Sequence, residues 1–280
     1  MVAADDKRFD VRFWGVRGTV PVPGPSTVRY GGNTACIEVT CGATKLIFDM
    51  GTGLRALGSH LVAQGTCQAH ILLTHTHLDH IAGFPFFKPA YTPHNRFDLW
   101  SGHLRAQGLD LQSTLAGLMR QPLFPVPIGL MHAAATFHDM HAGDVLSLGP
   151  GVTVCTAPLN HPGGATGYRV EYAGKVFALI TDTEHETGKS DRNVLRLIEA
   201  ADLVVYDATY TDEEFKGFIG WGHSTWQEGV RLCRAAGARQ LVLFHHEPER
   251  SDDALDAIAR RLHAELPSGL VGAEGLVLHL

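Results

Sequence analysis

The segment His75-Thr76-His77-Leu78-Asp79-His80 constrains this chain more than any other. It directly follows the apolar run Ile71-Leu72-Leu73, which predicts a short buried strand over residues 70–74. Imidazole nitrogens and carboxylate oxygens are suitable zinc ligands. In a tight loop, the His-x-His pair can direct two rings at one ion while Asp79 and His80 point toward a second. The segment therefore predicts a metal site at the end of a buried strand.

The hydrophobic pattern elsewhere predicts strands that alternate with helices. Strands are expected at residues 10–16, 35–41, 45–50, 152–156, 167–172, 175–181, 203–207, 241–244 and 275–280, and helices at 54–64, 109–120, 191–200, 224–234 and 253–262. The hairpin-like spacing within 35–50 and 167–181 implies antiparallel pairing. We therefore expect an α/β fold, an αββα sandwich in a single domain over residues 1–280, rather than a doubly wound parallel sheet. The role of residues 84–150 is not defined by the sequence.

Composition limits the classes of function. Hydrophobic residues make up 45% of the chain, so a sizeable core is available. The net charge of −6 argues against a broad nucleic-acid interface, which needs a basic face. The five cysteines are scattered without a Cys-x-x-Cys pair, which favours reduced thiols. Residues 1–10 are too polar for a signal peptide, and no apolar run approaches the roughly 20 residues of a membrane helix. We expect a cytoplasmic protein without a membrane partner.

The pattern His75-x-His77-x-Asp79-His80 resembles the signature of the metallo-β-lactamase superfamily. The resemblance implies that Asp49, in an Asp-x-Gly motif, supports the metal loop. It also implies further ligands that follow strands in the expected order, namely His161, Asp182 and His245. The implied assignment puts His75, His77 and His161 on one ion, puts Asp79, His80 and His245 on a second, and has Asp182 bridge both.

The nature of the metal follows from the same resemblance. Flavodiiron oxidoreductases of this superfamily have an acidic residue where His77 stands, so the resemblance implies a hydrolytic centre. Two divalent ions are expected, with zinc favoured by the mixed ligands and manganese also compatible. His246 follows a ligand but would face the opposite side of a strand. His94, His103, His132, His138 and His141 match no motif and are assigned no role.

Two later segments resemble ribonuclease Z and its relatives. These are Tyr206-Asp207-Ala208-Thr209-Tyr210 and Gly222-His223-Ser224-Thr225, and Gly31-Gly32-Asn33-Thr34-Ala35 resembles the same branch. A phosphodiester leaves as an alkoxide that needs a proton, and a histidine held by a carboxylate can donate it. The predicted catalytic residues are therefore His223 as the acid, Asp207 as its support and Asp79, which orients the nucleophile.

The substrate is expected to be a small phosphodiester, such as a cyclic nucleotide. Ribonuclease Z carries a long arm that grips transfer RNA between its third histidine and its bridging aspartate. Here His161 and Asp182 are only 21 positions apart, which leaves no room for an arm. Candidates for substrate contact are Asn33, Thr34, Tyr210, Trp221 and Ser224, with Trp221 or Phe218 able to stack on a base. Glu184 and His185 lie close to Asp182 in the sequence and could line the pocket, but solvated loop positions are favoured for them.

Other functions stay open at this point. They are RNA cleavage of the ribonuclease Z kind, hydrolysis of an ester, thioester or lactone at the same metals, and a non-catalytic metal-dependent sensor. The Asp207–His223 pair argues against the carbon esters, which need no dedicated acid for their leaving group. The complete ligand set argues against the sensor. A homodimer is compatible with the resemblance.

Overall fold

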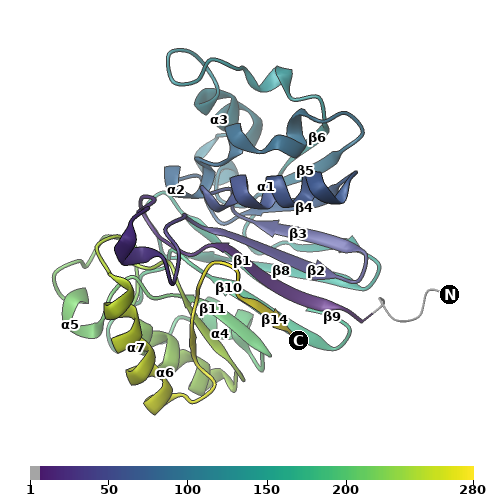
Figure 1. The fold of residues 1–280 in the computed structure, drawn as a ribbon. Helices are drawn as coiled ribbons and strands as arrows, with labels where there is room; N and C mark the ends of the chain where they lie inside the picture. The colour runs from purple at the N-terminus through teal and green to yellow at the C-terminus, as the bar shows by residue number, and fades with distance from the viewer. Residues whose placement is uncertain (1–6) are drawn as a thin grey trace.

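The computed structural model describes residues 7–280. The segment 1–10, for which no signal peptide was expected, therefore lies mostly outside the described residues. Two seven-stranded sheets pack face to face, and helices cover the outer face of each (Figure 1). This is the expected αββα sandwich, and the doubly wound alternative is wrong. Within residues 7–280, no helix is both long and apolar enough to cross a membrane.

The first sheet is built mainly from the N-terminal half of the chain. Its strands, in spatial order, are β14 (Val277–His279), β1 (Phe9–Gly15), β2 (Cys36–Cys41), β3 (Thr44–Phe48), β4 (Gln68–Leu73), β5 (Arg96–Ser101) and β6 (Ala134–Asp139). The predicted β2–β3 hairpin is antiparallel, with Ile37 opposite Phe48. From β3 to β6 the neighbours are parallel. The sheet is therefore mixed.

The second sheet repeats this plan with the C-terminal half. Its order is β13 (Leu270–Val271), β12 (Leu241–Phe244), β11 (Leu203–Asp207), β10 (Lys175–Ile180), β9 (Ala165–Tyr172), β8 (Val152–Leu159) and β7 (Val145–Gly149). The predicted β9–β10 hairpin is antiparallel, and β10, β11, β12 and β13 are parallel. Both sheets thus combine an antiparallel hairpin with a parallel run.

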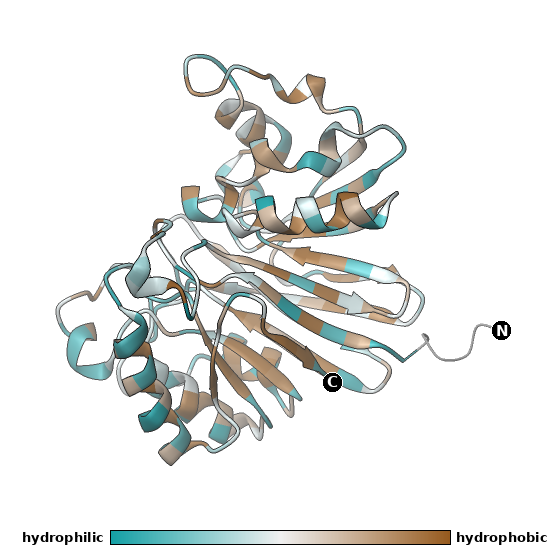
Figure 2. Cartoon of the chain, in the orientation of Figure 1, coloured by the Kyte–Doolittle hydropathy of each residue, from teal (hydrophilic) through white to brown (hydrophobic). Residues whose placement is uncertain are grey.

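The helices divide between the two outer faces. Helices α1 (Gly53–Gln64) and α3 (Leu111–Leu118) pack on the first sheet, and α4 (Arg192–Ile198), α6 (Trp226–Ala236) and α7 (Asp252–Glu265) pack on the second. Two short helices are α2 (Leu78–Ile81) and α5 (Asp212–Phe215), and short 3-10 turns occur at Pro25–Thr27, Phe84–Phe86, Lys88–Tyr91, Arg105–Gln107 and Ile128–Leu130. The strands are mostly hydrophobic, whereas α7 carries hydrophilic residues beside apolar ones (Figure 2).

The apolar core between the sheets also fixes the end of β4. Phe48 packs edge-on against Tyr168 of β9, with ring centroids 5.3 Å apart. The fully buried Tyr168 hydroxyl donates a hydrogen bond to the carbonyl of Leu73, the last residue of β4. The predicted metal loop starts two residues later. The inter-sheet core therefore anchors this loop to the second sheet.

Several elements differ from the sequence-based expectations. Strands β5, β6, β7 and β13 were not predicted, and the helix expected at 109–120 is limited to Leu111–Leu118. Strand β6 lies at a sheet edge with its first three residues exposed, so it lacks a hydrophobic alternation. Helix α6 starts two residues later than expected. Its N-cap is Thr225, whose hydroxyl accepts the Glu228 N–H.

Candidate metal centre

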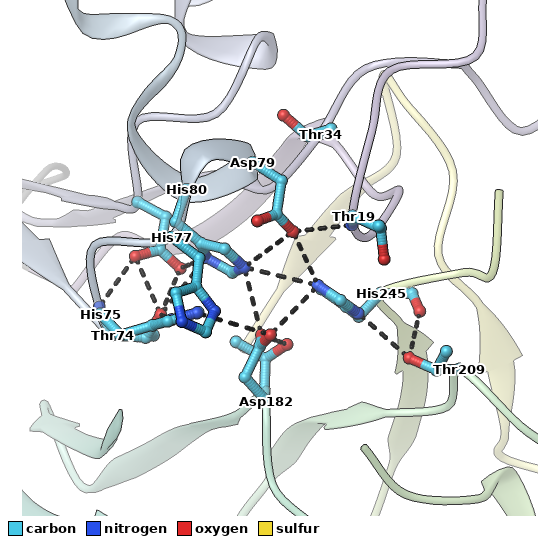
Figure 3. Close-up of polar contacts among 12 residues, drawn as sticks. Thr19, Thr34, Thr74, His75, His77, Asp79, His80, Asp182, Thr209 and His245 are labelled. Atoms are coloured by element: carbon cyan, nitrogen blue, oxygen red, sulfur yellow. Dashed lines mark hydrogen bonds and ion pairs between the residues drawn. The ribbon is translucent and has the colours of Figure 1, made fainter. Parts of the chain in front are cut away.

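All seven predicted ligands converge at one place where strand ends of the two sheets meet. Figure 3 labels each of them except His161. Five of them lie in loops that follow the carboxyl ends of strands β4, β8, β10 and β12, and the other two, Asp79 and His80, lie in the short helix α2. The ligand atoms form two groups, and within each group they lie within 4.8 Å of one another. The first group is His75, His77 and His161, and the second is Asp79, His80, Asp182 and His245. Asp182 Oδ1 lies 3.7 Å from His75 Nε2 and 3.9 Å from His161 Nε2 of the first group. Asp182 therefore lies beside ligand-type atoms of both groups.

Hydrogen bonds orient the two rings of the second group. His80 donates from Nδ1 to Asp49 Oδ2 at 2.9 Å, so its Nε2 faces Asp182 Oδ2 at 3.2 Å. His245 Nδ1 lies 3.0 Å from Thr209 Oγ1, and its Nε2 lies 3.2 Å from Asp79 Oδ2. In both rings the hydrogen-bonded Nδ1 leaves Nε2 as the atom that faces the centre, which is the arrangement of metal-binding histidines whose other nitrogen is hydrogen-bonded.

The first group is oriented in the same way. His161 donates from Nδ1 to the carbonyl of Gly222 at 2.8 Å, and His75 Nδ1 lies 3.1 Å from Thr74 Oγ1. Gly222 must be glycine here, because its φ is +84° and an added Cβ would lie 2.3 Å from His161 Nδ1. The expected supporting role of Asp49 extends to Thr74, whose N–H it accepts at 2.8 Å.

The donor set fits a divalent metal. His75 is buried, and its Nε2 has no hydrogen-bond partner although it is aimed into the cluster. Elsewhere in the cluster lone-pair atoms approach one another closely, with His77 Nδ1 and His161 Nε2 at 3.1 Å and His80 Nε2 and His245 Nε2 at 3.4 Å. Two donors bound to one tetrahedral zinc ion are about 3.3 Å apart, given bond lengths of about 2.0 Å. These spacings suit donors that share a cation.

The charges of the centre suit the same interpretation. Burial lowers the pKa of His75 well below its usual value, which keeps the ring neutral and able to ligate. Burial alone would raise the pKa of Asp182, but His245 and His80 beside it hold that pKa well below the usual range. Asp182 is therefore a buried carboxylate anion, which needs positive charge close by.

The backbone is strained around these ligands. Four of the seven non-glycine residues with positive φ in the described part of the chain lie here, namely Thr19, Asp49, Asp182 and His245, with φ between 57° and 65°. Aspartate and histidine are among the types enriched in this region, whereas the β-branched Thr19 is a genuine outlier. Its N–H donates to Asp79 Oδ2 at 2.7 Å. Strain of this kind clusters at functional sites.

His223 and Asp207 form a pair at the edge of the cluster. His223 donates from Nδ1 to Asp207 Oδ2 at 3.0 Å, and its ring stacks on His245 with centroids 4.8 Å apart. Burial would lower the pKa of His223, but Asp207 outweighs it and the pKa rises to about 9. The same nitrogen, His223 Nδ1, lies 3.9 Å from Asp182 Oδ1. Asp207 thus accepts the Nδ1 proton of His223 in a hydrogen bond, and the ring also stands in two groups of ligand-type side chains, one with His161 and Asp182 and one with Asp207 and His245.

The candidates for substrate contact separate by exposure. Thr34 and Ser224 are fully buried, and Asn33 is bonded to Glu274, so these three are held by the protein itself. Tyr210 stacks on Phe218 with centroids 4.5 Å apart and planes at 5°. Trp221 is 63% exposed beside them. Of the two aromatic residues considered for base stacking, Trp221 is the one with a free face.

The structure refines the expectations for three nearby residues. His246 does lie away from the centre, where its Nε2 bonds the Gly272 carbonyl, but β12 ends at Phe244 and the turn at His245 causes this. Glu184 and His185 are not simply solvated, because Glu184 accepts two backbone N–H groups and His185 bonds Ser224.

Other residues of the centre were missed. Thr19 acts through its backbone N–H and so has no sequence signal. Thr209, which lies between His245 and Asp207, stands in the Tyr206–Tyr210 motif but was given no role. His103 was assigned no role, yet it is 7% exposed and its Nε2 lies 3.0 Å from Thr76 Oγ1, within the metal loop. Burial lowers the pKa of His103 to about 4.

Comparisons with known proteins agree with this geometry. The family described as "Beta-lactamase superfamily domain" matches residues 44–246. A ribonuclease Z of Bradyrhizobium sp. (strain ORS 278) is 24% identical over 307 aligned positions, covering 91% of this chain and 95% of that protein.

Solved structures share the fold over nearly the whole chain. The metallo-β-lactamase fold protein YhfI of Bacillus subtilis has a TM-score of 0.73 at 16% identity, covering 98% of this chain and all of that one. A diphosphatase from the PhnP family has a TM-score of 0.70 at 17% identity, with 98% of each chain covered. The protein therefore belongs to the beta-lactamase superfamily domain family, as a ribonuclease Z-like, metal-dependent hydrolase of the metallo-β-lactamase fold.

Proposed function

We propose that this protein hydrolyses a small phosphodiester at a centre of two divalent metal ions, with zinc as the preferred metal. The observation that carries the proposal is the Asp207–His223 pair, which adjoins the seven-ligand cluster. Hydrolysis of a carbon ester or lactone depends less on such an acid than hydrolysis of an alkyl phosphodiester, whose alkoxide leaving group needs a proton. The similarity to a ribonuclease Z over 91% of the chain supports the same class of bond.

Each residue of the centre has a distinct part in this reaction. His75, His77 and His161 would hold one ion, Asp79, His80 and His245 the other, and Asp182 both. The ions, when bound, supply Lewis-acid chemistry that activates water and neutralises phosphate charge. Asp79, fixed by the Thr19 N–H, orients the attacking water. As the bond from phosphorus to the leaving oxygen breaks, His223 gives its Nε2 proton to that oxygen, and Asp207 stabilises the charged ring beforehand.

The absence of an arm favours a small substrate. Residues between His161 and Asp182 form only the β9–β10 hairpin, joined by Ala173 and Gly174. The aligned length of 307 positions exceeds the 280 residues of this chain, so the ribonuclease Z relative carries insertions that this chain lacks. The exposed Trp221 offers a stacking surface for one base. Cyclic nucleotides, or similar small cyclic diesters, combine these requirements.

RNA cleavage of the ribonuclease Z kind is the second candidate. The extent of similarity to proteins of that name favours it. It requires many phosphate contacts from Lys and Arg, for which a chain with 23 basic and 29 acidic residues has less capacity. We place either activity in the cytoplasm, in keeping with five free cysteines.

The experiment that tests the proposal compares leaving groups. His223→Ala should lose roughly 10²–10⁴-fold in kcat on a dialkyl or cyclic phosphodiester. It should lose much less on bis-p-nitrophenyl phosphate, because p-nitrophenolate departs without a proton. A lactone and a thioester belong in the same panel. Equal losses on both diesters, or faster turnover of a carbon ester, would contradict the proposal.

A further inference from the structure

We infer that Glu184 is a positioning residue that locks together the three loops carrying His161, Asp182 and His223. Glu184 stands two residues after Asp182, in the loop that follows β10. Its backbone and its carboxylate reach different loops, so this one residue is connected to both other segments. The metal half of the inference stands on the geometry alone, and the catalytic half rests on the proposed function of His223.

The backbone of Glu184 is tied to the loop of His161. Its N–H donates to the carbonyl of Asn160 at 2.8 Å, and its own carbonyl accepts from Asn160 Nδ2 at 2.8 Å. This reciprocal pair involves the residue immediately before His161. The positions of the first-group ligand His161 and of Asp182 are therefore coupled through one rigid link.

The carboxylate of Glu184 binds the loop that carries His223. One oxygen, Oε2, accepts the N–H of Gly220 at 2.7 Å and that of Gly222 at 2.9 Å. Hydrogen bonds from N–H groups to a carboxylate are stronger than those between neutral groups. Both glycines have positive φ, and residues 217–222 include three glycines, so the loop has little preference of its own for this conformation. The carboxylate therefore supplies much of the loop's order.

This loop acts on the centre in two directions. The carbonyl of Gly222 accepts the Nδ1 proton of His161 and so fixes the tautomer that turns Nε2 toward the cluster. The next residue is His223. A second tie from the same segment runs from His185 Nδ1 to Ser224 Oγ at 2.8 Å, just beyond His223. Loss of the Glu184 carboxylate should therefore affect both metal affinity and proton delivery.

The test measures both quantities in Glu184→Ala, with Glu186→Ala as the matched control. Glu186 is in the same loop, is 64% exposed at its side chain and is paired with Lys189 on the surface. Zinc affinity is measured by titrating metal-free protein against a competing chelator. Loss of a group that orients a ligand costs roughly 10–100-fold in metal affinity, so this range is expected for Glu184→Ala and none for Glu186→Ala. Turnover should fall more on an alkyl diester than on bis-p-nitrophenyl phosphate.

Two further variants keep the inference testable if Glu184→Ala unfolds. Glu184→Gln retains an amide oxygen that can accept both N–H groups, and should recover most of the zinc affinity. Glu184→Asp keeps the charge but withdraws it by one methylene, and should fall between Gln and Ala. Wild-type zinc affinity in Glu184→Ala, or in Glu184→Asp if Glu184→Ala does not fold, with an unchanged ratio of the two substrates, would overturn the inference. If wild type hydrolyses no phosphodiester, the proposed function fails, while the zinc titration still decides the role of Glu184.

Discussion

Replacing Asp49 by asparagine tests whether the orientation of His80 is what makes the second ion site. Asp49 is buried and accepts three hydrogen bonds, from the Thr74 N–H at 2.8 Å, from Thr74 Oγ1 at 2.9 Å and from His80 Nδ1 at 2.9 Å. Asparagine tolerates the φ of +60° found here, so the backbone should stay in place. The change therefore isolates the chemistry of one side chain.

The magnitude follows from the contacts. An amide nitrogen at the position of Oδ2 would meet the Nδ1 proton of His80, donor against donor. His80 would then move its proton to Nε2, the atom that faces Asp79 and Asp182. If the amide were reversed, its NH2 group would instead meet the Thr74 N–H. Each buried donor left without a hydrogen bond in this way would cost about 1–3 kcal/mol of stability. Disturbing such a partner costs roughly 10–100-fold in metal affinity, which is about 1.4–2.8 kcal/mol.

The assay is a zinc titration of metal-free protein by competition with a chromophoric chelator. Wild type should take up two ions, and Asp49→Asn should hold one of them 10–100-fold more weakly. Asp98→Asn is the control, because Asp98 also accepts from a histidine, His138 at 2.9 Å, but lies outside the cluster and partly exposed. Two ions bound by Asp49→Asn with wild-type affinity would refute the reasoning.

Two other predictions concern the glycine loop and the substrate. Gly222→Ala should abolish binding of the ion assigned to His161, because the added Cβ would lie 2.3 Å from that ring. The control is Gly237→Ala, at φ +66° with open space around it. This control should lower only the free energy of unfolding, by about 1–2 kcal/mol, as measured by thermal unfolding. Similar metal contents in the two variants would show that the contact with His161 is unimportant. At matched enzyme concentration and physiological salt, turnover of cyclic nucleotides should far exceed cleavage of precursor transfer RNA. Efficient cleavage at the 3′ boundary of transfer RNA with cyclic nucleotides untouched would show that the short hairpin had been over-interpreted.

The candidate ligands were predictable because the family resemblance gives their residue types and their order in the chain. His75, His161, Asp182 and His245 each stand one or two residues after a strand, and these strand ends from both sheets come together. Residue type and place in the chain therefore carry the signal. The antiparallel hairpins were also predictable, since two short apolar runs separated by a glycine turn have few other ways to pair.

What escaped prediction depends on backbone groups or on distant loops. The Thr19 N–H and the Gly222 carbonyl orient Asp79 and His161, but any residue type has these groups. Glu184 looks like an ordinary polar loop residue until the loop 36 positions further along folds onto it. Strands β5 and β6 were missed because prolines surround them and because β6 is an exposed edge.

The left-handed backbone at Asp182 and His245 limits how this centre can be redesigned for another metal. Cysteine is the donor that shifts a site toward softer ions. At φ near +60° an ordinary side chain costs about 1–2 kcal/mol, and His245 has a φ of 59°. His75, His77 and His161 are not among the residues with positive φ, so thiolates introduced there carry no such penalty. Thiolates should thus be tolerated at His75, His77 and His161, whereas Asp182 and His245 should resist replacement.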